Sequence, residues 1–297
     1  MSKVVRVLLA CALLVASAAC SARGTNGAGG GSDGLDVVAS FYPLEFAAKR
    51  VGGEHVHVTD LTQPGAEPHD LELTPQEVGT VAQADAVVYL SGFQPSVDGA
   101  IDNADSKARV DVAKYADLRA ASGTARDPHF WLDPQRMRAV IKGIAHRLGA
   151  IDPDHAADYK QNAADLTTRL DRLDRVYRKG LRSCASNDLV TSHSAFGYLA
   201  RRYGLHQVGV TGLSPEAEPG PQKLAQVTRY VRRHHVHTVY YETLVSPKVA
   251  DTIASETGAR TAVLDPIEGI TKKSKGSNYL AVMRSNLDAL RKGQQCR

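Results

Sequence analysis

The sequence predicts an α/β protein with two similar lobes, each a mainly parallel sheet flanked by helices, joined by one long rigid helix. In both halves of the chain, short apolar runs of strand length alternate with helical segments, which is the pattern of parallel sheets covered by helices. Between the halves lies a helical segment without a helix breaker that is longer than ordinary helices of globular proteins. We place the lobes at 35–150 and 183–297 and the linking helix at 151–182.

The elements of the first lobe begin at Leu35. The stretch LDVVASFYP reads as a buried strand that ends at Pro43, and the glycines at 52 and 53 terminate the helix that follows it. HVHVTDL alternates like a strand. Thr74 begins a helix, because it can cap the first turn while Glu77 reaches back to it. ADAVVYLSG is a further buried strand with a glycine at its end.

The linking helix begins where Asp152 and Pro153 can cap and start a helix, and no helix breaker follows before Gly180. A helix of about 28 residues would be about 42 Å long and could span both lobes. One apolar stripe with spacings of mostly three and four runs along it: Leu166, Leu170, Leu173, Val176, Tyr177 and Leu181. A coiled coil is the alternative, although the stripe is too short to favour it.

After Gly180 the strand and helix signals alternate again, which predicts the second lobe. The apolar runs that read as strands are NDLVTSH, HQVGV, HTVYYE and TAVLD. A final helix is predicted for YLAVMRSNLDALRKG, and no internal sequence repeat is evident.

Residues 1–19 have the three-part form of a secretory signal. Lys3 and Arg6 make a basic start, and the apolar run that follows is too short for the roughly 20 residues that span a bilayer. The small residues before Cys20 resemble a bacterial lipoprotein signal, which implies that Cys20 is lipidated and anchors the protein to the outer face of the cell membrane. Simple secretion is the alternative. Residues 20–34 lack large apolar side chains, so we expect a flexible tether there.

The overall composition is that of a soluble globular protein, with 43% hydrophobic and 23% charged residues. The formal net charge is only +4, and Lys3 and Arg6 of the predicted signal contribute two of these charges. Acidic and basic residues are interspersed, which indicates a mixed, solvated surface. No nucleic-acid partner is expected from such a balance.

Two of the four cysteines remain once the signal is removed and Cys20 carries lipid, namely Cys184 and Cys296. Outside the cytoplasm two such thiols pair more often than they stay free, so we predict a disulfide that fastens the C-terminal tail to the middle of the chain. Metal binding by either cysteine is the weaker alternative, because neither lies in a CxxC or similar spacing.

Most of the eleven histidines are expected at the surface or in satisfied core positions, including those of the charged helix end at 232–237. Three histidines and one aspartate stand apart, because each follows a strand or lies in a proline-bounded loop: His69, His129, His193 and Asp265. Open α/β sheets place their sites at the carboxyl ends of strands, and two of these residues come from each lobe. They could therefore meet in the cleft between the lobes.

Neutral imidazoles and one carboxylate are ligands that Zn²⁺ accepts in a tetrahedral shell. The set contains no thiolate, which makes Cu(I) a poor candidate. Because the ligands must be deprotonated, metal affinity should fall as the pH drops through the histidine range near about 6.5. Glu242 is the reserve ligand, and its more ordinary role would be a hydrogen bond to a ligand or a stabilising pair within the lobe.

Several segments resemble the cluster A-I zinc and manganese solute-binding lipoproteins of ABC transporters. They are SFYPL at 40–44, PGAEPHD at 64–70, DPHFWLDP at 127–134, TSHSAFGYLARRYGL at 191–205, VYYE at 239–242 and SNYLAVMRSNLDAL at 277–290. The resemblance implies two lobes with a rigid connecting helix, and metal ligands at His69, His129, His193 and Asp265. It also implies a monomeric receptor that hands the ion to an ABC permease and its ATPase subunit. VLDPIEG matches the last ligand loop of the family only loosely.

Two features of the sequence bear on the choice between zinc and manganese. The stretch from Asp117 to Asp127 is short and lacks the histidine-rich loop of many zinc members. A histidine at the third ligand position, His193, resembles the zinc-preferring arrangement, whereas manganese prefers more oxygen ligands. The prediction is therefore zinc, with manganese as the alternative.

A binding protein is the leading prediction, because four protein ligands leave no position for an activated water molecule. A metal-dependent hydrolase is the second hypothesis, in which Glu242 or Glu67 would act as the general base. The sequence has no HExxH, GxSxG or P-loop motif, so we do not expect an enzyme. A cell-surface adhesin is a third hypothesis that no aromatic patch or repeat in the sequence supports. We expect only small loop movements on metal binding, since the long helix limits closure of the lobes.

Overall fold

A computed structural model describes residues 34–104, 108–120 and 126–297 of the chain, and these residues belong to one compact unit. The predicted signal, the lipidation site at Cys20 and nearly all of the tether lie outside the described residues. Within the described part of the chain, no helix combines the length and the apolar character needed to cross a membrane.

The first lobe is built on a four-stranded sheet in the order β2-β1-β3-β4, with every neighbouring pair parallel. Val37 at the centre of β1 is in register with Val58 on one side and Ala86 on the other. The strands are β1 Leu35–Ala39, β2 Val56–Asp60, β3 Ala86–Tyr89 and β4 Arg109–Asp111. Because the two inner strands are apolar and buried on both faces, they read in the sequence as continuous hydrophobic runs.

The second lobe repeats this arrangement in a parallel sheet of order β6-β5-β7-β8. Its strands are β5 Asp188–Thr191, β6 His206–Gly209, β7 Thr238–Tyr241 and β8 Arg260–Val263. In both sheets the first strand in sequence lies between the second and the third. The second strand is therefore added on one side of the first strand, and the later strands are added on its other side. Loops beyond the carboxyl ends of such strands are the usual place for a ligand site in open α/β sheets.

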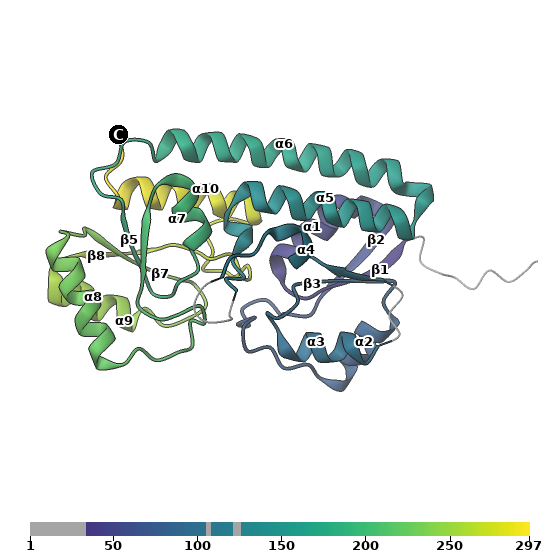
Figure 1. Cartoon of the computed structure of the whole chain (residues 1–297), viewed down its shortest axis with the longest axis horizontal. Helices are drawn as coiled ribbons and strands as arrows, with labels where there is room; N and C mark the ends of the chain where they lie inside the picture. The colour runs from purple at the N-terminus through teal and green to yellow at the C-terminus, as the bar shows by residue number, and fades with distance from the viewer. Residues whose placement is uncertain (1–33, 105–107, 121–125) are drawn as a thin grey trace, which may run out of the picture. The chain divides into compact units, whose positions relative to one another are not determined.

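Helices cover the faces of both sheets (Figure 1). In the first lobe they are α1 Tyr42–Gly52, α2 Pro75–Gln83, α3 Pro95–Asp102 and α4 Ala113–Ala116. In the second they are α7 Gly197–Tyr203, α8 Pro221–Arg233, α9 Lys248–Thr257 and α10 Tyr279–Gly293. The predicted cap of α2 is confirmed, because the Thr74 hydroxyl accepts from the Glu77 N–H while the Glu77 carboxylate accepts from the Thr74 N–H.

The long helix α6 spans Ala156–Gly180 and contains 25 residues, so it is about 38 Å long. It begins later than predicted, because the turn η3 at Pro153–His155 separates it from a second helix, α5 at Pro134–Ile151. The sequence did not identify α5, which packs along α6. Val176 is 49% exposed and lies outside the buried stripe, since it is about 100° around the helix from the buried Tyr177.

Side chains fasten α6 to both lobes. The Asn162 amide donates to the Val51 carbonyl at the end of α1, at 3.0 Å. The buried Tyr177 hydroxyl donates to the Met283 carbonyl of α10, at 2.6 Å. Figure 1 shows α6 running above helices of both lobes. The helix is therefore a common support rather than a single hinge.

One hydrophobic core runs from the first lobe through the helical layer into the second. Near the lobe junction, Trp131 of the turn η2 (Phe130–Leu132) donates its indole N–H to the Pro266 carbonyl, at 2.7 Å. The Tyr279 hydroxyl at the start of α10 donates to the Trp131 carbonyl. A continuous core with cross-lobe hydrogen bonds favours small displacements over a wide hinge motion.

A disulfide joins Cys184, just beyond α6, to Cys296 in the C-terminal tail. Beside it, the Arg297 N–H donates to the Ser183 carbonyl at 2.9 Å and the Ala185 N–H donates to the Gln294 carbonyl at 3.0 Å. The tail is thus held to the chain segment that leads from α6 into β5.

Replacing both cysteines, Cys184→Ser with Cys296→Ser, should lower the free energy of unfolding by about 2–4 kcal/mol, because the cross-link restricts a long loop in the unfolded chain. Urea denaturation followed by circular dichroism measures this change. Wild-type protein treated with a reductant is the matched control and should unfold like the double variant. Equal midpoints for oxidised and reduced wild type would contradict the role of the disulfide.

Candidate metal centre

His69 lies in the loop between β2 and α2, bounded by Pro64 and Pro68. Its backbone N–H donates to Glu67 Oε1 at 3.0 Å, which shapes the turn just before it. The imidazole meets the Phe93 ring edge to face, with ring centroids 4.8 Å apart. Packing and the turn together aim the ring toward the second lobe.

His129 precedes the turn η2, and Asp127 holds it at two points. Asp127 Oδ1 accepts from the His129 backbone N–H at 3.0 Å and lies 2.8 Å from its ring Nδ1. A carboxylate on Nδ1 selects the tautomer whose Nε2 carries the free lone pair. His129 Nε2 therefore points away from Asp127 and into the lobe junction.

His193 directly follows β5 and has the same kind of support. Its Nδ1 lies 2.7 Å from Glu242 Oε1, and the Ser192 hydroxyl donates to the same oxygen at 3.0 Å. Glu242 follows β7, the strand next to β5 in the sheet. The sheet itself therefore positions the carboxylate that orients this histidine.

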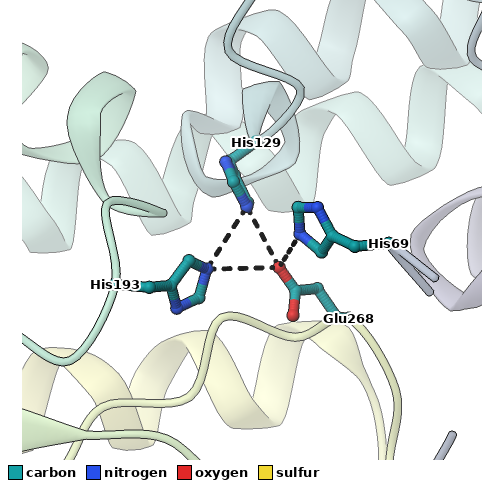
Figure 2. A group of neighbouring side chains, drawn as sticks. All are labelled: His69, His129, His193 and Glu268. Carbon is teal, nitrogen blue, oxygen red and sulfur yellow. Dashed lines mark hydrogen bonds and ion pairs between the residues drawn. The ribbon is translucent and has the colours of Figure 1, made fainter. Parts of the chain in front are cut away.

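Glu268 lies in the loop after β8 and brings the three histidines together. Its Oε1 is 3.1 Å from His129 Nε2, 3.3 Å from His69 Nε2 and 3.6 Å from His193 Nε2. His193 Nε2 and His129 Nε2 are 3.4 Å apart. Figure 2 shows the three rings converging on this one carboxylate oxygen.

The four donor atoms all lie within 4.8 Å of one another. A tetrahedron with metal–ligand distances of about 2.0–2.1 Å has edges of about 3.3–3.4 Å, and four of the six donor separations, at 3.1–3.6 Å, nearly match such a zinc shell. The second oxygen of Glu268, Oε2, is buried and has no hydrogen-bond partner among the described residues. A buried carboxylate with a free oxygen and three facing imidazoles suits a divalent cation.

Asp265 is not one of the four residues that the structure brings together. It is buried, its Oδ1 accepts from the Ile267 N–H at 2.8 Å, and its own N–H donates to Asn286 Oδ1 at 3.0 Å. The side chain therefore shapes the loop, and the turn at Pro266 and Ile267 carries Glu268 to the histidines. VLDPIEG contains both acids, and the sequence prediction weighed only the first of them.

The reserve residue, Glu242, lies behind His193 instead of among the converging donors. Two further histidines that the sequence assigned to the surface, His234 and His206, face Asp188 on the second lobe, with Nδ1 to carboxylate distances of 3.1 and 3.5 Å. They do not contribute to the group around Glu268.

The protonation of the group reflects competing effects. Burial lowers the pKa of His193, but hydrogen bonds to Glu242 and Glu268 outweigh it and raise that pKa to about 10. For His129, burial again lowers the pKa and the contacts with Asp127 and Glu268 raise it by more. Burial alone would raise the pKa of Glu268, yet the three imidazoles hold it well below the usual value. A proton on the His193 imidazole thus balances part of the buried negative charge when no cation is bound.

Zinc binding at pH 7 should release at least one proton. The raised pKa of His193 means that its ring is protonated there, and a metal needs the neutral ring, so affinity should increase with pH up to about 10. Isothermal titration calorimetry in buffers of different ionisation enthalpy counts the protons. A binding enthalpy independent of the buffer would contradict this assignment.

Glu242→Gln should weaken zinc binding by about 10–100-fold, because an amide orients and polarises the His193 ring less well than a carboxylate does. Competition with a chromophoric chelator measures the affinity. Ser192→Ala removes only the hydroxyl contact to the same oxygen and should have a smaller effect. Unchanged affinity of the glutamine variant would show that the carboxylate does not support the ligand.

Comparisons with known proteins agree with a zinc site. A family model described as the periplasmic component A of a zinc-uptake complex matches residues 37–293. The high-affinity zinc uptake system protein ZnuA of Bacillus subtilis (strain 168) is 37% identical over 306 residues, which cover 96% of this chain and 95% of that protein. The zinc-binding lipoprotein AdcA of Streptococcus pneumoniae (strain ATCC BAA-334 / TIGR4) is 34% identical over 276 residues. That match covers 86% of this chain and 55% of AdcA, so this chain spans about half of AdcA.

Solved structures share the fold. The laminin binding protein of Streptococcus agalactiae, described as bifunctional with adhesin and metal transporting activity, superposes with a TM-score of 0.81 at 34% identity, covering 88% of this chain and 99% of that one. The Zn(II)-bound ZnuA-like domain of Streptococcus pneumoniae AdcA gives a TM-score of 0.77 at 35% identity, with the same coverage. The predicted two-lobe α/β fold class is confirmed.

Proposed function

The chain belongs to the family of the periplasmic component A of zinc-uptake complexes, and from this premise we propose that it is an extracytoplasmic zinc receptor. It binds one Zn²⁺ through His69, His129, His193 and Glu268. The observation that carries the proposal is the convergence of these four donor atoms within 4.8 Å of one another.

Zinc suits this site better than manganese does. Three imidazole nitrogens and one carboxylate make a nitrogen-rich shell with tetrahedral spacing, which Zn²⁺ accepts readily. Manganese favours carboxylate, carbonyl and water oxygens in a larger shell, and the donor group offers one carboxylate. The names of the relatives point the same way, since both are described as zinc proteins.

The protein acts as a receptor and not as an enzyme. Four protein ligands fill a tetrahedral shell and leave no open position at which a water molecule could be activated. One of the two candidate general bases, Glu242, is also occupied, because its Oε1 atom accepts hydrogen bonds from His193 and Ser192. Tight, closed coordination suits capture and carriage of the ion.

The receptor delivers zinc to an ABC permease with its ATPase subunit, and it works as a lipid-anchored monomer on the outer face of the membrane. The family description as one component of an uptake complex supports a membrane partner. The small residues before Cys20 support the anchor, as does the description of one relative as a lipoprotein. Loading is expected to move loops around the site more than the lobes, since Trp131 and Pro266 are hydrogen-bonded across the junction.

Removing one ligand should weaken zinc binding by about 100-fold or more, since zinc-site free energies of about 10–16 kcal/mol are shared among four ligands. The variants are His69→Ala, His129→Ala, His193→Ala and Glu268→Gln. Elemental analysis of the purified proteins and competitive titration with Zn²⁺ and Mn²⁺ give metal content and affinity.

Asp265→Asn is the matched control, because it alters a buried acid three residues before Glu268 that shapes the loop without facing the histidines. It should keep zinc affinity close to that of wild type. A loss as large as that of Glu268→Gln would place Asp265 in the shell. Wild-type protein that takes up manganese in preference to zinc would refute the zinc assignment.

A further inference from the structure

The four donors differ in their access to solvent. The side chains of His129 and Glu268 are 0% exposed and that of His193 is 1% exposed, whereas that of His69 is 9% exposed. An incoming ion therefore meets His69 first. We call this more exposed side of the group, on the first-lobe loop that carries His69, the opening.

Glu67 lies at this opening. Its side chain is 13% exposed, and its Oε1 is 3.9 Å from His69 Nε2, the atom that faces the metal position. Oε1 also accepts from the His69 backbone N–H, which fixes the carboxylate beside the ring. The other oxygen, Oε2, is buried without a hydrogen-bond partner among the described residues, an arrangement that costs free energy unless a ligand uses it.

The loop around Glu67 forms the seam between the lobes. Gly65 has a positive φ of 91°, and a Cβ built there would be 3.9 Å from Thr271 Cγ2, in the loop that carries Glu268. The same two loops meet at Gly269, where a Cβ would be 4.0 Å from the Gly65 nitrogen. Glu67, two residues after Gly65, is thus close to the contact between the loop of His69 and the loop of Glu268.

The first lobe has an excess of acidic residues and the second lobe an excess of basic ones, in contrast to the mixed distribution expected from the sequence. Residues 35–150 contain 16 Asp and Glu against 11 Lys and Arg, and residues 183–297 contain nine against 15. Near the site, the exposed Asp70 and Glu72 lie on the loop of His69, while Lys272 and Lys273 lie on the opposite loop. A cation is drawn to the acidic side of such a divided surface.

We propose that Glu67 is a capture ligand, which binds the arriving zinc ion at the opening and passes it by way of His69 to the buried group. This inference rests on the proposed zinc-binding function and adds a fifth residue to it. Glu67 holds the ion only in transit, because the four inner donors complete the tetrahedral shell once the ion has entered.

The test compares the rates of zinc binding and release. Trp131 is the only tryptophan of the chain and its ring centroid is 5.3 Å from that of His129, so its fluorescence reports on the site without a label. Stopped-flow mixing of zinc-free protein with Zn²⁺ gives the association rate, and a chelator chase gives the dissociation rate. Glu67→Gln should slow association on the order of tenfold and leave dissociation unchanged.

Glu72→Gln is the matched control, because it makes the same substitution in the same loop at an exposed position. It should change association by less than about twofold, since exposed charges are screened by salt. Glu67→Asp keeps the carboxylate and should recover most of the lost rate. It also tests the proposal if the glutamine variant does not fold.

Association of Glu67→Gln at the wild-type rate, or slowed no more than in Glu72→Gln, would overturn the proposal. So would a faster dissociation with unchanged association, which would make Glu67 a permanent ligand. In each case wild type would still bind zinc, so the proposed function would stand. Wild-type protein without zinc affinity would instead refute the function itself.

Discussion

The structure depends on a carboxylate that is fully buried at the junction of two lobes. Removing the Glu268 charge from water carries a large free-energy cost, which only nearby positive charge can offset. Three imidazoles face the carboxylate and offset this cost, and a divalent cation bound among the four donors would do the same. Both states keep the donors near one another, so the surrounding fold must hold the four loops close together and leaves room only for small loop movements.

The outer carboxylates and the helical layer provide that support. Asp127 and Glu242 bind the far nitrogens of His129 and His193, so these rings are oriented before a metal arrives. Behind them, α6 is hydrogen-bonded to α1 and to α10, and one continuous core joins the two sheets. Preorganisation of this kind reduces the ordering entropy lost on binding and favours high affinity.

Hydrophobic patterning predicted much of the fold. Seven of the eight strands in the described part of the chain lie where the sequence predicted them, and their parallel pairing agrees with the alternation of strands and helices. The three-residue strand β4, with the sequence RVD, was not predicted because it contains no apolar run. The helix α5 was not predicted, because the start signal at Pro153 and the apolar stripe beyond it indicate only α6. The three histidines that the structure gathers could be selected, since each follows a strand or lies in a proline-bounded loop.

The acid that accompanies them could not be selected by the same reasoning. Asp265 and Glu268 are three residues apart in one loop, and position after a strand favours the first. The choice depends on a backbone turn at Ile267, which has a φ of 60°. A positive φ is rare for a β-branched residue, so the sequence does not predict this turn. Asp265 closes that turn by accepting from the Ile267 N–H, and the turn then directs Glu268 inward.

The four donors are spread over most of the folded chain, from residue 69 to residue 268, and each belongs to a different loop. No fragment shorter than that span contains all four. A molecule that is cut in a donor loop, or whose last strand has not yet joined its sheet, therefore holds an incomplete set. With the proposed ligand set, only a completely folded molecule can offer all four donors to zinc, which makes occupancy of the site a readout of complete folding.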